Sequence, residues 1–168
     1  MQKPISIFIL FFTSICLLVY SCGTSGDPAV PNHLANTSTG DNTITFGATQ
    51  YNLSFKSCTI DTSNGGHYVM MGKDIGSGFQ IGILFYDASA PTASSTYTIV
   101  TTPTLSNGQC YVSFIAPLIA STQYNGTSGS VNFSPNSGNN KVTLTNVPVV
   151  NIGDSTKTST ITGSWSCQ

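Results

Sequence analysis

The chain has 168 residues and a formal net charge of −1, and only 7% of its side chains are charged, against about 25% in a typical soluble domain. It contains neither glutamate nor arginine. Nucleic-acid binding needs a basic face to neutralise phosphates, so this composition argues against it. Glycosidases place two carboxylates, often glutamates, around the scissile bond, and six scattered aspartates do not favour that chemistry.

An apolar run from Ile5 to Tyr20 follows Lys3 at the start of the chain. Its roughly 16 residues suit the hydrophobic part of an export signal and fall short of the ~20 that a membrane-spanning helix needs. We predict a signal peptide over residues 1–21 that is cleaved between Ser21 and Cys22. An uncleaved membrane anchor and a plain secretory signal cut near Ser21 are the two alternatives.

The stretch Leu18-Val19-Tyr20-Ser21-Cys22 resembles a bacterial lipobox. The resemblance implies that a diacylglyceryl group is attached to the sulfur of Cys22, which becomes the new N-terminus. Two or more acyl chains hold a protein stably on a membrane, whereas one chain does not. We therefore expect an outer-membrane lipoprotein of a bacterial cell envelope, which faces the periplasm or the cell surface and has the membrane as a partner through Cys22.

Residues 22–41 are rich in Gly, Ser, Thr, Asn and Pro and contain few apolar side chains. This composition is typical of a flexible linker. The sequence thus predicts three parts: a signal peptide over 1–21, a tether over 22–41 and one folded domain over 42–168.

The domain shows alternation of apolar and polar residues with a period of two, which indicates strands. The first expected strand, 51–56, places Tyr51, Leu53 and Phe55 on one half-buried face. Residues 75–78 are expected to form a hairpin turn, and Asn125-Gly126 a tight turn. Further strands are expected at 67–73, 79–86, 96–100, 109–115, 130–134, 142–150 and 159–167.

About eight to ten short strands with regular turns predict an all-β fold, an antiparallel β-sandwich or partly open barrel. Pro148 falls inside one expected strand, where it must occupy an edge or a bulge because it cannot donate a hydrogen bond. Trp165 shares a strand face with Ile161 and is expected in the core.

Three cysteines remain after lipidation, namely Cys58, Cys110 and Cys167. In an oxidising compartment we expect two of them to form a disulfide and the third to remain a buried thiol. Cys110 and Cys167 share strand faces with apolar side chains and are expected to point inward. The sequence leaves all three pairings open, and we favour a bridge from Cys167 to an earlier strand.

The residues offer little catalytic chemistry. His33 lies in the tether and His67 at a strand start, without the spacing of a zinc site. Cys58, Asp61 and His67 lie close in sequence, but nothing fixes them as nucleophile, orienter and base. No metal, cofactor or catalytic residue is predicted, and we expect a protein that is not an enzyme.

Tyrosines are the main candidates for ligand binding. Tyr68 and Tyr86 flank one expected hairpin, and Tyr111 alternates with the inward-facing Val112, so it is expected to face solvent. Exposed aromatic rings beside Asn and Thr side chains would suit stacking on sugar rings. The alternative is that these tyrosines pack at the sandwich edges with their hydroxyls in water.

Roughly the last fifty residues carry three strand motifs, at 129–133, 142–147 and 161–166. They resemble the small envelope lipoproteins of Bacteroidetes-type bacteria, in which a Gly-x-Val-x-Ile strand, a hairpin and a closing Ile-x-Gly-x-Phe strand are common. The resemblance implies a β-sandwich on a lipid tether and transfers no catalytic residue. We therefore expect a structural or protein-interaction role, with a glycan-binding or adhesion module as the alternative.

Overall fold

The structure is a computed structural model, which describes residues 41–62, 66–116, 122–136 and 138–167. The predicted signal peptide, most of the predicted tether, and therefore Ser21 and Cys22 lie outside the described residues. All strands belong to one compact unit, Ala35–Gln168. No helix in the described segments is long and apolar enough to cross a membrane.

The fold is all-β, as predicted, with eleven strands where about eight to ten were expected. The strands are β1 (Thr43–Phe46), β2 (Thr49–Asn52), β3 (Phe55–Asp61), β4 (His67–Asp74), β5 (Phe79–Phe85), β6 (Ser95–Ile99), β7 (Gln109–Ala116), β8 (Thr122–Gly126), β9 (Ser130–Asn136), β10 (Asn139–Asn151) and β11 (Thr158–Cys167).

Two expectations about individual strands were wrong. The run 51–56 is not one strand, because the chain turns a corner at Leu53 and Ser54 between β2 and β3. Leu53 is buried, but Phe55 beyond the corner is 48% exposed. Asn125-Gly126 is not a turn but the end of β8, because Gly126 lies against Ile99 and Val112, where a larger side chain would not fit.

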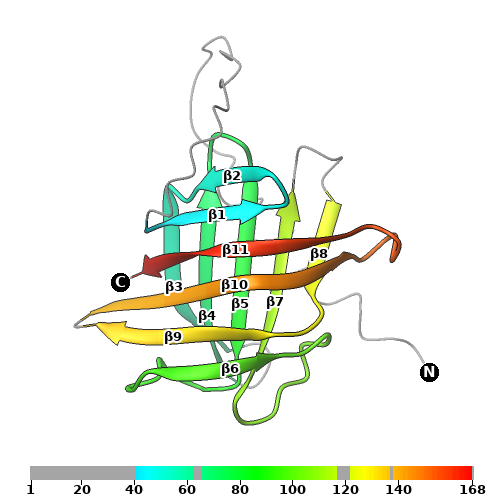
Figure 1. The fold of residues 1–168 in the computed structure, drawn as a ribbon. Helices are drawn as coiled ribbons and strands as arrows, with labels where there is room; N and C mark the ends of the chain where they lie inside the picture. The colour runs from blue at the N-terminus through cyan, green and yellow to red at the C-terminus, as the bar shows by residue number, and fades with distance from the viewer. Residues whose placement is uncertain (1–40, 63–65, 117–121, 137, 168) are drawn as a thin grey trace. The chain divides into compact units, whose positions relative to one another are not determined.

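The strands form one mixed sheet that folds over itself into two layers. Strands β1, β2, β6, β9, β10 and β11 cross in front of β3, β4, β5, β7 and β8 (Figure 1). The path through the sheet runs β2-β1-β11-β10-β9-β6-β7-β5-β4-β3. Strand β8 pairs with β7 and β10, so β6, β7, β8, β10 and β9 close a ring. The pairing is antiparallel except between β6 and β7, which are parallel.

Strand β10 is long enough to change partner along its length. Its first half pairs with β9 and its last residues, from Val149, pair with β8. Between them a bulge interrupts the register with β11 after Leu144, and Asn146 adopts a positive φ of 48°. Pro148 lies beside this bulge, as expected for a residue without an N–H.

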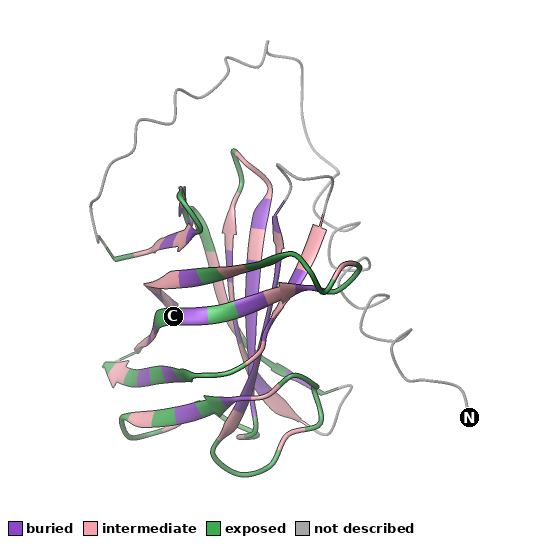
Figure 2. Ribbon diagram, turned by 45° about the vertical axis from the view of Figure 1, so that its right-hand side comes forward, coloured by how far each residue is buried: buried purple, intermediate pink, exposed green. Residues whose placement is uncertain are grey.

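The core lies between the two layers and is rich in aromatic side chains. Trp165 is fully buried there, as predicted, and Cys110, Val112 and Phe114 all point inward with no exposed area. Burial alternates with exposure along β6 and β9, while the central strands of the back layer are buried almost throughout (Figure 2). Strands β5 and β7 thus carry buried residues on both faces.

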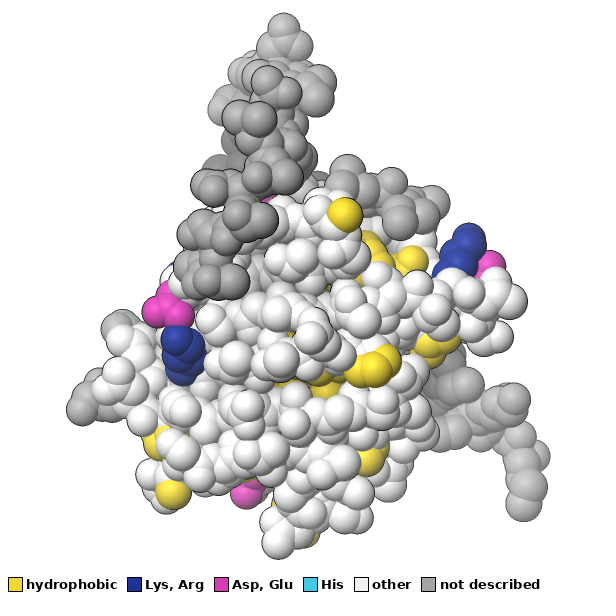
Figure 3. Space-filling model, viewed as in Figure 1, with side chains coloured by type: hydrophobic (Ala, Val, Ile, Leu, Met, Phe, Trp, Pro, Cys, Tyr) yellow, Lys and Arg dark blue, Asp and Glu magenta, His cyan; other side chains and the backbone are white. Residues whose placement is uncertain are grey.

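The outer surface is nearly uncharged. The face viewed in Figure 3 is made mostly of polar, uncharged side chains and backbone, with scattered hydrophobic side chains, and with lysine and aspartate side chains only near its margins. Two ion pairs, Lys141–Asp41 and Lys157–Asp154, lie on the described surface, and all four side chains are substantially exposed. Exposed pairs of this kind contribute little to stability.

At Gly163 the backbone of a neighbouring strand leaves no room for a side chain. It lies in β11 opposite Ile44 of β1 with a φ of 149°, and a Cβ there would lie 2.1 Å from the carbonyl oxygen of Thr43. We predict that Gly163→Ala lowers the free energy of unfolding by about 3 kcal/mol, because it combines backbone strain with a steric clash.

Urea denaturation would measure this loss, with Gly108→Ala as the matched control. Gly108 also has a positive φ, 73°, but no atom lies within 4 Å of its ideal Cβ, so only the backbone cost of about 1 kcal/mol is expected. Equal losses in the two variants would contradict the close approach of β1 to β11.

Candidate functional site

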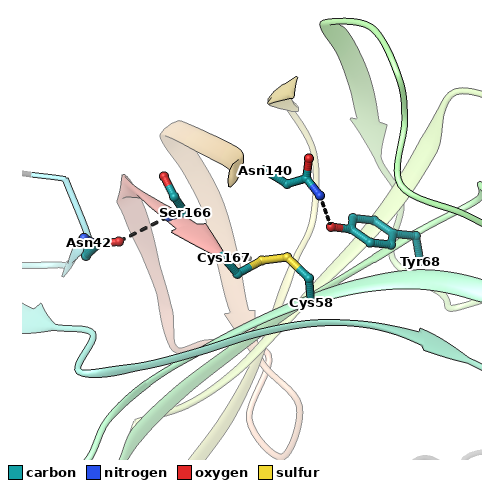
Figure 4. The surroundings of a disulfide bond; sticks show 6 residues. All are labelled: Asn42, Cys58, Tyr68, Asn140, Ser166 and Cys167. Atoms are coloured by element: carbon teal, nitrogen blue, oxygen red, sulfur yellow. Dashed lines mark hydrogen bonds between the residues drawn. A yellow bond between two sulfur atoms is a disulfide. The ribbon is translucent and has the colours of Figure 1, made fainter. Parts of the chain in front are cut away.

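The structure joins Cys58 of β3 to Cys167 at the end of β11 by a disulfide, with a Cα–Cα distance of 5.7 Å (Figure 4). This agrees with the expected bridge from Cys167 to an earlier strand. The bridge connects the edge strand of the back layer to a strand of the front layer. Cys110 is the remaining described cysteine, and it is a buried free thiol.

Two hydrogen bonds lie beside the disulfide (Figure 4). The side-chain amide of Asn140 donates to the hydroxyl of Tyr68 at 2.7 Å, which links β10 to β4 across the layers. The side-chain oxygen of Asn42 accepts from the backbone N–H of Ser166 at 3.2 Å. The start of the described chain, the end of β11 and the edge of the back layer are therefore held together around one covalent bond.

The three candidate ligand-binding tyrosines do not form one exposed cluster. Tyr68 is 4% exposed, and Tyr111, which was expected to face solvent, is 5% exposed. Burial raises the pKa of both hydroxyls. Tyr111 does face away from the core side of β7, as its alternation predicts, but that face of β7 is buried as well. Only Tyr86, 42% exposed, presents its ring to solvent as a sugar-stacking residue would.

A group of polar side chains lies at the end of the β4–β5 hairpin where Tyr86 is found. Tyr97 donates to a carboxylate oxygen of Asp87 at 2.5 Å, and its pKa is raised by burial and by this bond to the Asp87 carboxylate. One ring nitrogen of His67, Nδ1, lies 3.0 Å from the carbonyl oxygen of Tyr86, which makes it the donor in that pair. The Asp87–Tyr97 pair was not anticipated, because no local sequence motif links residues on β6 with the loop after β5.

This group lacks the parts of a catalytic or metal site. Cys58 is in the disulfide, so it cannot act as a nucleophile with Asp61 and His67. Among the described residues no group of three His, Cys, Asp or Glu side chains could hold a metal ion. His67, Asp87 and Tyr97 each take part in a hydrogen bond within the fold.

No family model, no curated protein and no solved structure matches this chain. The resemblance to Bacteroidetes-type lipoproteins therefore stays a prediction from sequence motifs. The function has to be argued from the disulfide, the surface and the N-terminal sequence.

The buried thiol of Cys110 makes the stability of the fold depend on pH in the alkaline range. Its thiol lies in the core, and burial raises its pKa from 9.0 to about 12. Below about pH 9 the thiol keeps its proton in both the folded and the unfolded chain, so its contribution to stability is complete. Above that pH the unfolded thiol ionises while the folded one does not, and the contribution is lost as the pH rises toward 12.

We predict that the free energy of unfolding falls between pH 9 and 12, with a contribution from Cys110 of at most about 1.4 kcal/mol per pH unit. Cys110→Ala should be less stable at pH 7 because it leaves a cavity, but its stability should fall less steeply above pH 9. The free energy of unfolding of Cys110→Ala should still fall somewhat with rising pH, because the pKa of Tyr97 is also raised in the folded protein. Urea denaturation across this range would test this, and identical slopes would contradict it.

Proposed function

We propose that this protein is a lipid-anchored lipoprotein of a bacterial cell envelope, held at the outer membrane through Cys22. Its β-sandwich acts without catalysis, in a structural or protein-interaction role. The proposal combines the lipobox-like stretch that ends at Cys22 with the tether that precedes β1.

The disulfide is the observation that carries the proposal beyond the N-terminal sequence. Disulfides such as Cys58–Cys167 form and persist in oxidising compartments and are rare in the cytosol. An exported protein is therefore the consistent interpretation of both the N-terminal apolar run and the bridge. The low charge supports a role at a surface rather than on nucleic acid or on an acidic substrate.

Glycan binding remains the second candidate, with weaker support than the sequence suggested. Stacking on a sugar needs an exposed ring, and two of the three candidate rings, those of Tyr68 and Tyr111, are buried. The surface near Tyr86 is the part of this hypothesis that keeps an exposed aromatic side chain.

Replacement of the anchor residue tests the proposal directly. We predict that Cys22→Ser, expressed in a bacterial host that processes lipoproteins, moves the protein from the membrane fraction to the soluble fraction, because no acyl chain can be attached. Ser21→Thr keeps the cysteine and serves as a control that should stay in the membrane fraction.

Fractionation should be combined with mass measurement of the N-terminus. The wild type should begin at residue 22 and carry a lipid mass, while the Cys22→Ser chain should carry none. Wild-type protein without a lipid mass on residue 22 would overturn the lipid anchor, and wild-type protein that also keeps residues 1–21 would favour an uncleaved apolar segment.

A further inference from the structure

Few large apolar side chains are exposed on the described surface, and two of them lie near one another in the fold. The exposed set is Phe55, Ile60, Ile75, Tyr86 and Ile152. Ile75 is the most exposed at 64%, and Phe55 is 48% exposed. Both lie at the end of the back layer where β3 begins and where the β4–β5 turn is found.

Hydrogen bonds hold these two positions together. The hydroxyl of Ser54, the residue before Phe55, accepts from the backbone N–H of Ile75 at 3.3 Å. The same hydroxyl donates to the carbonyl oxygen of Lys73 at 3.4 Å, and Lys73 lies opposite Phe55 in the β3–β4 register. We name Phe55, Lys56, Lys73 and Ile75 the exit corner, because the tether meets the domain beside it.

The point where the tether enters the domain is fixed by contacts with the β2–β3 corner and with β10 and β11. The carbonyl oxygen of Asn42 accepts from the backbone N–H of Leu53 at 2.9 Å, and Leu53 precedes Ser54. Asp41, the first described residue, forms an ion pair with Lys141. The chain that leads back to Cys22 therefore leaves the domain two residues before β1, next to the β2–β3 corner.

The charges of the exit corner favour an acidic surface. Lys73 lies directly across the sheet from Phe55 and shares its face, whereas Lys56, the next residue of β3, points to the opposite face at the same end of the sheet. Neither lysine forms an ion pair among the described side chains. Asp74 is the nearest carboxylate in sequence, and it accepts from the backbone N–H groups of Gly76 and Ser77 within the turn. Apolar side chains beside lysines are typical of surfaces that lie in the interface of a membrane with anionic lipids.

We propose that the exit corner is a membrane-contact surface, which rests on anionic phospholipid with Phe55 and Ile75 inserted among the headgroups. The proposal rests on the lipid anchor at Cys22. Nineteen steps separate Cys22 from Asp41 (41 − 22), and a flexible linker of that length has a root-mean-square span of about 25 Å. The tether thus keeps this corner within reach of the bilayer at a high effective concentration.

The exposed Tyr86 marks the opposite end of the same hairpin. Tyr86 follows the end of β5, and Ile75 follows the end of β4, so the length of β4 separates the two residues. The seven steps of β4 from His67 to Asp74 correspond to about 23 Å of extended strand. An anchored domain that rests on its exit corner holds Tyr86 away from the lipid. Ile75 and Tyr86 therefore make a matched pair of reporter positions.

The experiment uses the mature lipidated full-length chain, carrying Ile75→Trp or Tyr86→Trp, in vesicles of phosphatidylethanolamine, phosphatidylglycerol and brominated phosphatidylcholine. Bromine quenches tryptophan that reaches the acyl boundary, and the buried Trp165 supplies a constant background measured in the wild type. We expect bromine-dependent quenching for Ile75→Trp at least about twice that for Tyr86→Trp, as for an apolar side chain inserted about 5–10 Å into the interface. Flotation of the vesicles reports the anchor separately.

Equal quenching at the two positions, with the protein floating on the vesicles, would overturn the membrane-contact corner and leave the anchor intact. Protein that does not float at all would overturn both the anchor and the corner. As a further check, Lys56→Gln with Lys73→Gln should reduce the quenching of Ile75→Trp and leave flotation unchanged. Unchanged quenching in that variant would overturn the role of the two lysines in holding the corner on anionic lipid.

Discussion

The disulfide between Cys58 and Cys167 is the constraint that fixes the edge strand β3 to the opposite layer of the sandwich. The sheet path ends at β2 and β3, and β3 pairs along one side with β4 alone. The bridge ties this edge to β11 of the opposite layer and closes a loop with a sequence separation of 109, nearly the whole domain. In a chain-entropy account, a loop of that length stabilises the folded state by about 4–5 kcal/mol.

Stability in this protein comes from burial and the covalent bridge rather than from charge. The core holds Trp165 and several phenylalanines with no exposed area, while the two described ion pairs are exposed and contribute little. Serine, threonine and asparagine replace charged residues on the surface. The free energy of unfolding should therefore change little with salt concentration, or with pH near neutrality. The few charges that remain have local roles, such as the Asp41–Lys141 pair just before β1. This leaves the lysines of the exit corner as an unusual feature of an otherwise neutral surface.

The sequence predicted the features that depend on local periodicity and missed those that depend on the second layer. Alternation gave the all-β fold, the β4–β5 hairpin and the inward direction of Cys110 and Trp165. It did not reveal the corner at Leu53 and Ser54, because the alternation of residues 51–55 continues through a change of layer. Alternation also placed Tyr111 on the correct face of β7 but could not show that this face is buried. Likewise the partner of Cys167, and the pairing of Asp87 with Tyr97, depend on contacts between distant strands that no local pattern encodes.

The central claim is that the disulfide holds β3 onto an otherwise self-supporting sandwich. Amide hydrogen exchange on the oxidised protein and on protein reduced with dithiothreitol tests it most directly, strand by strand. On reduction, the amides of β3 and of the last residues of β11 should lose protection first, while those of β5, β7 and the first half of β10 exchange only through global unfolding. A uniform loss of protection across all strands, or unchanged protection in β3, would contradict the account.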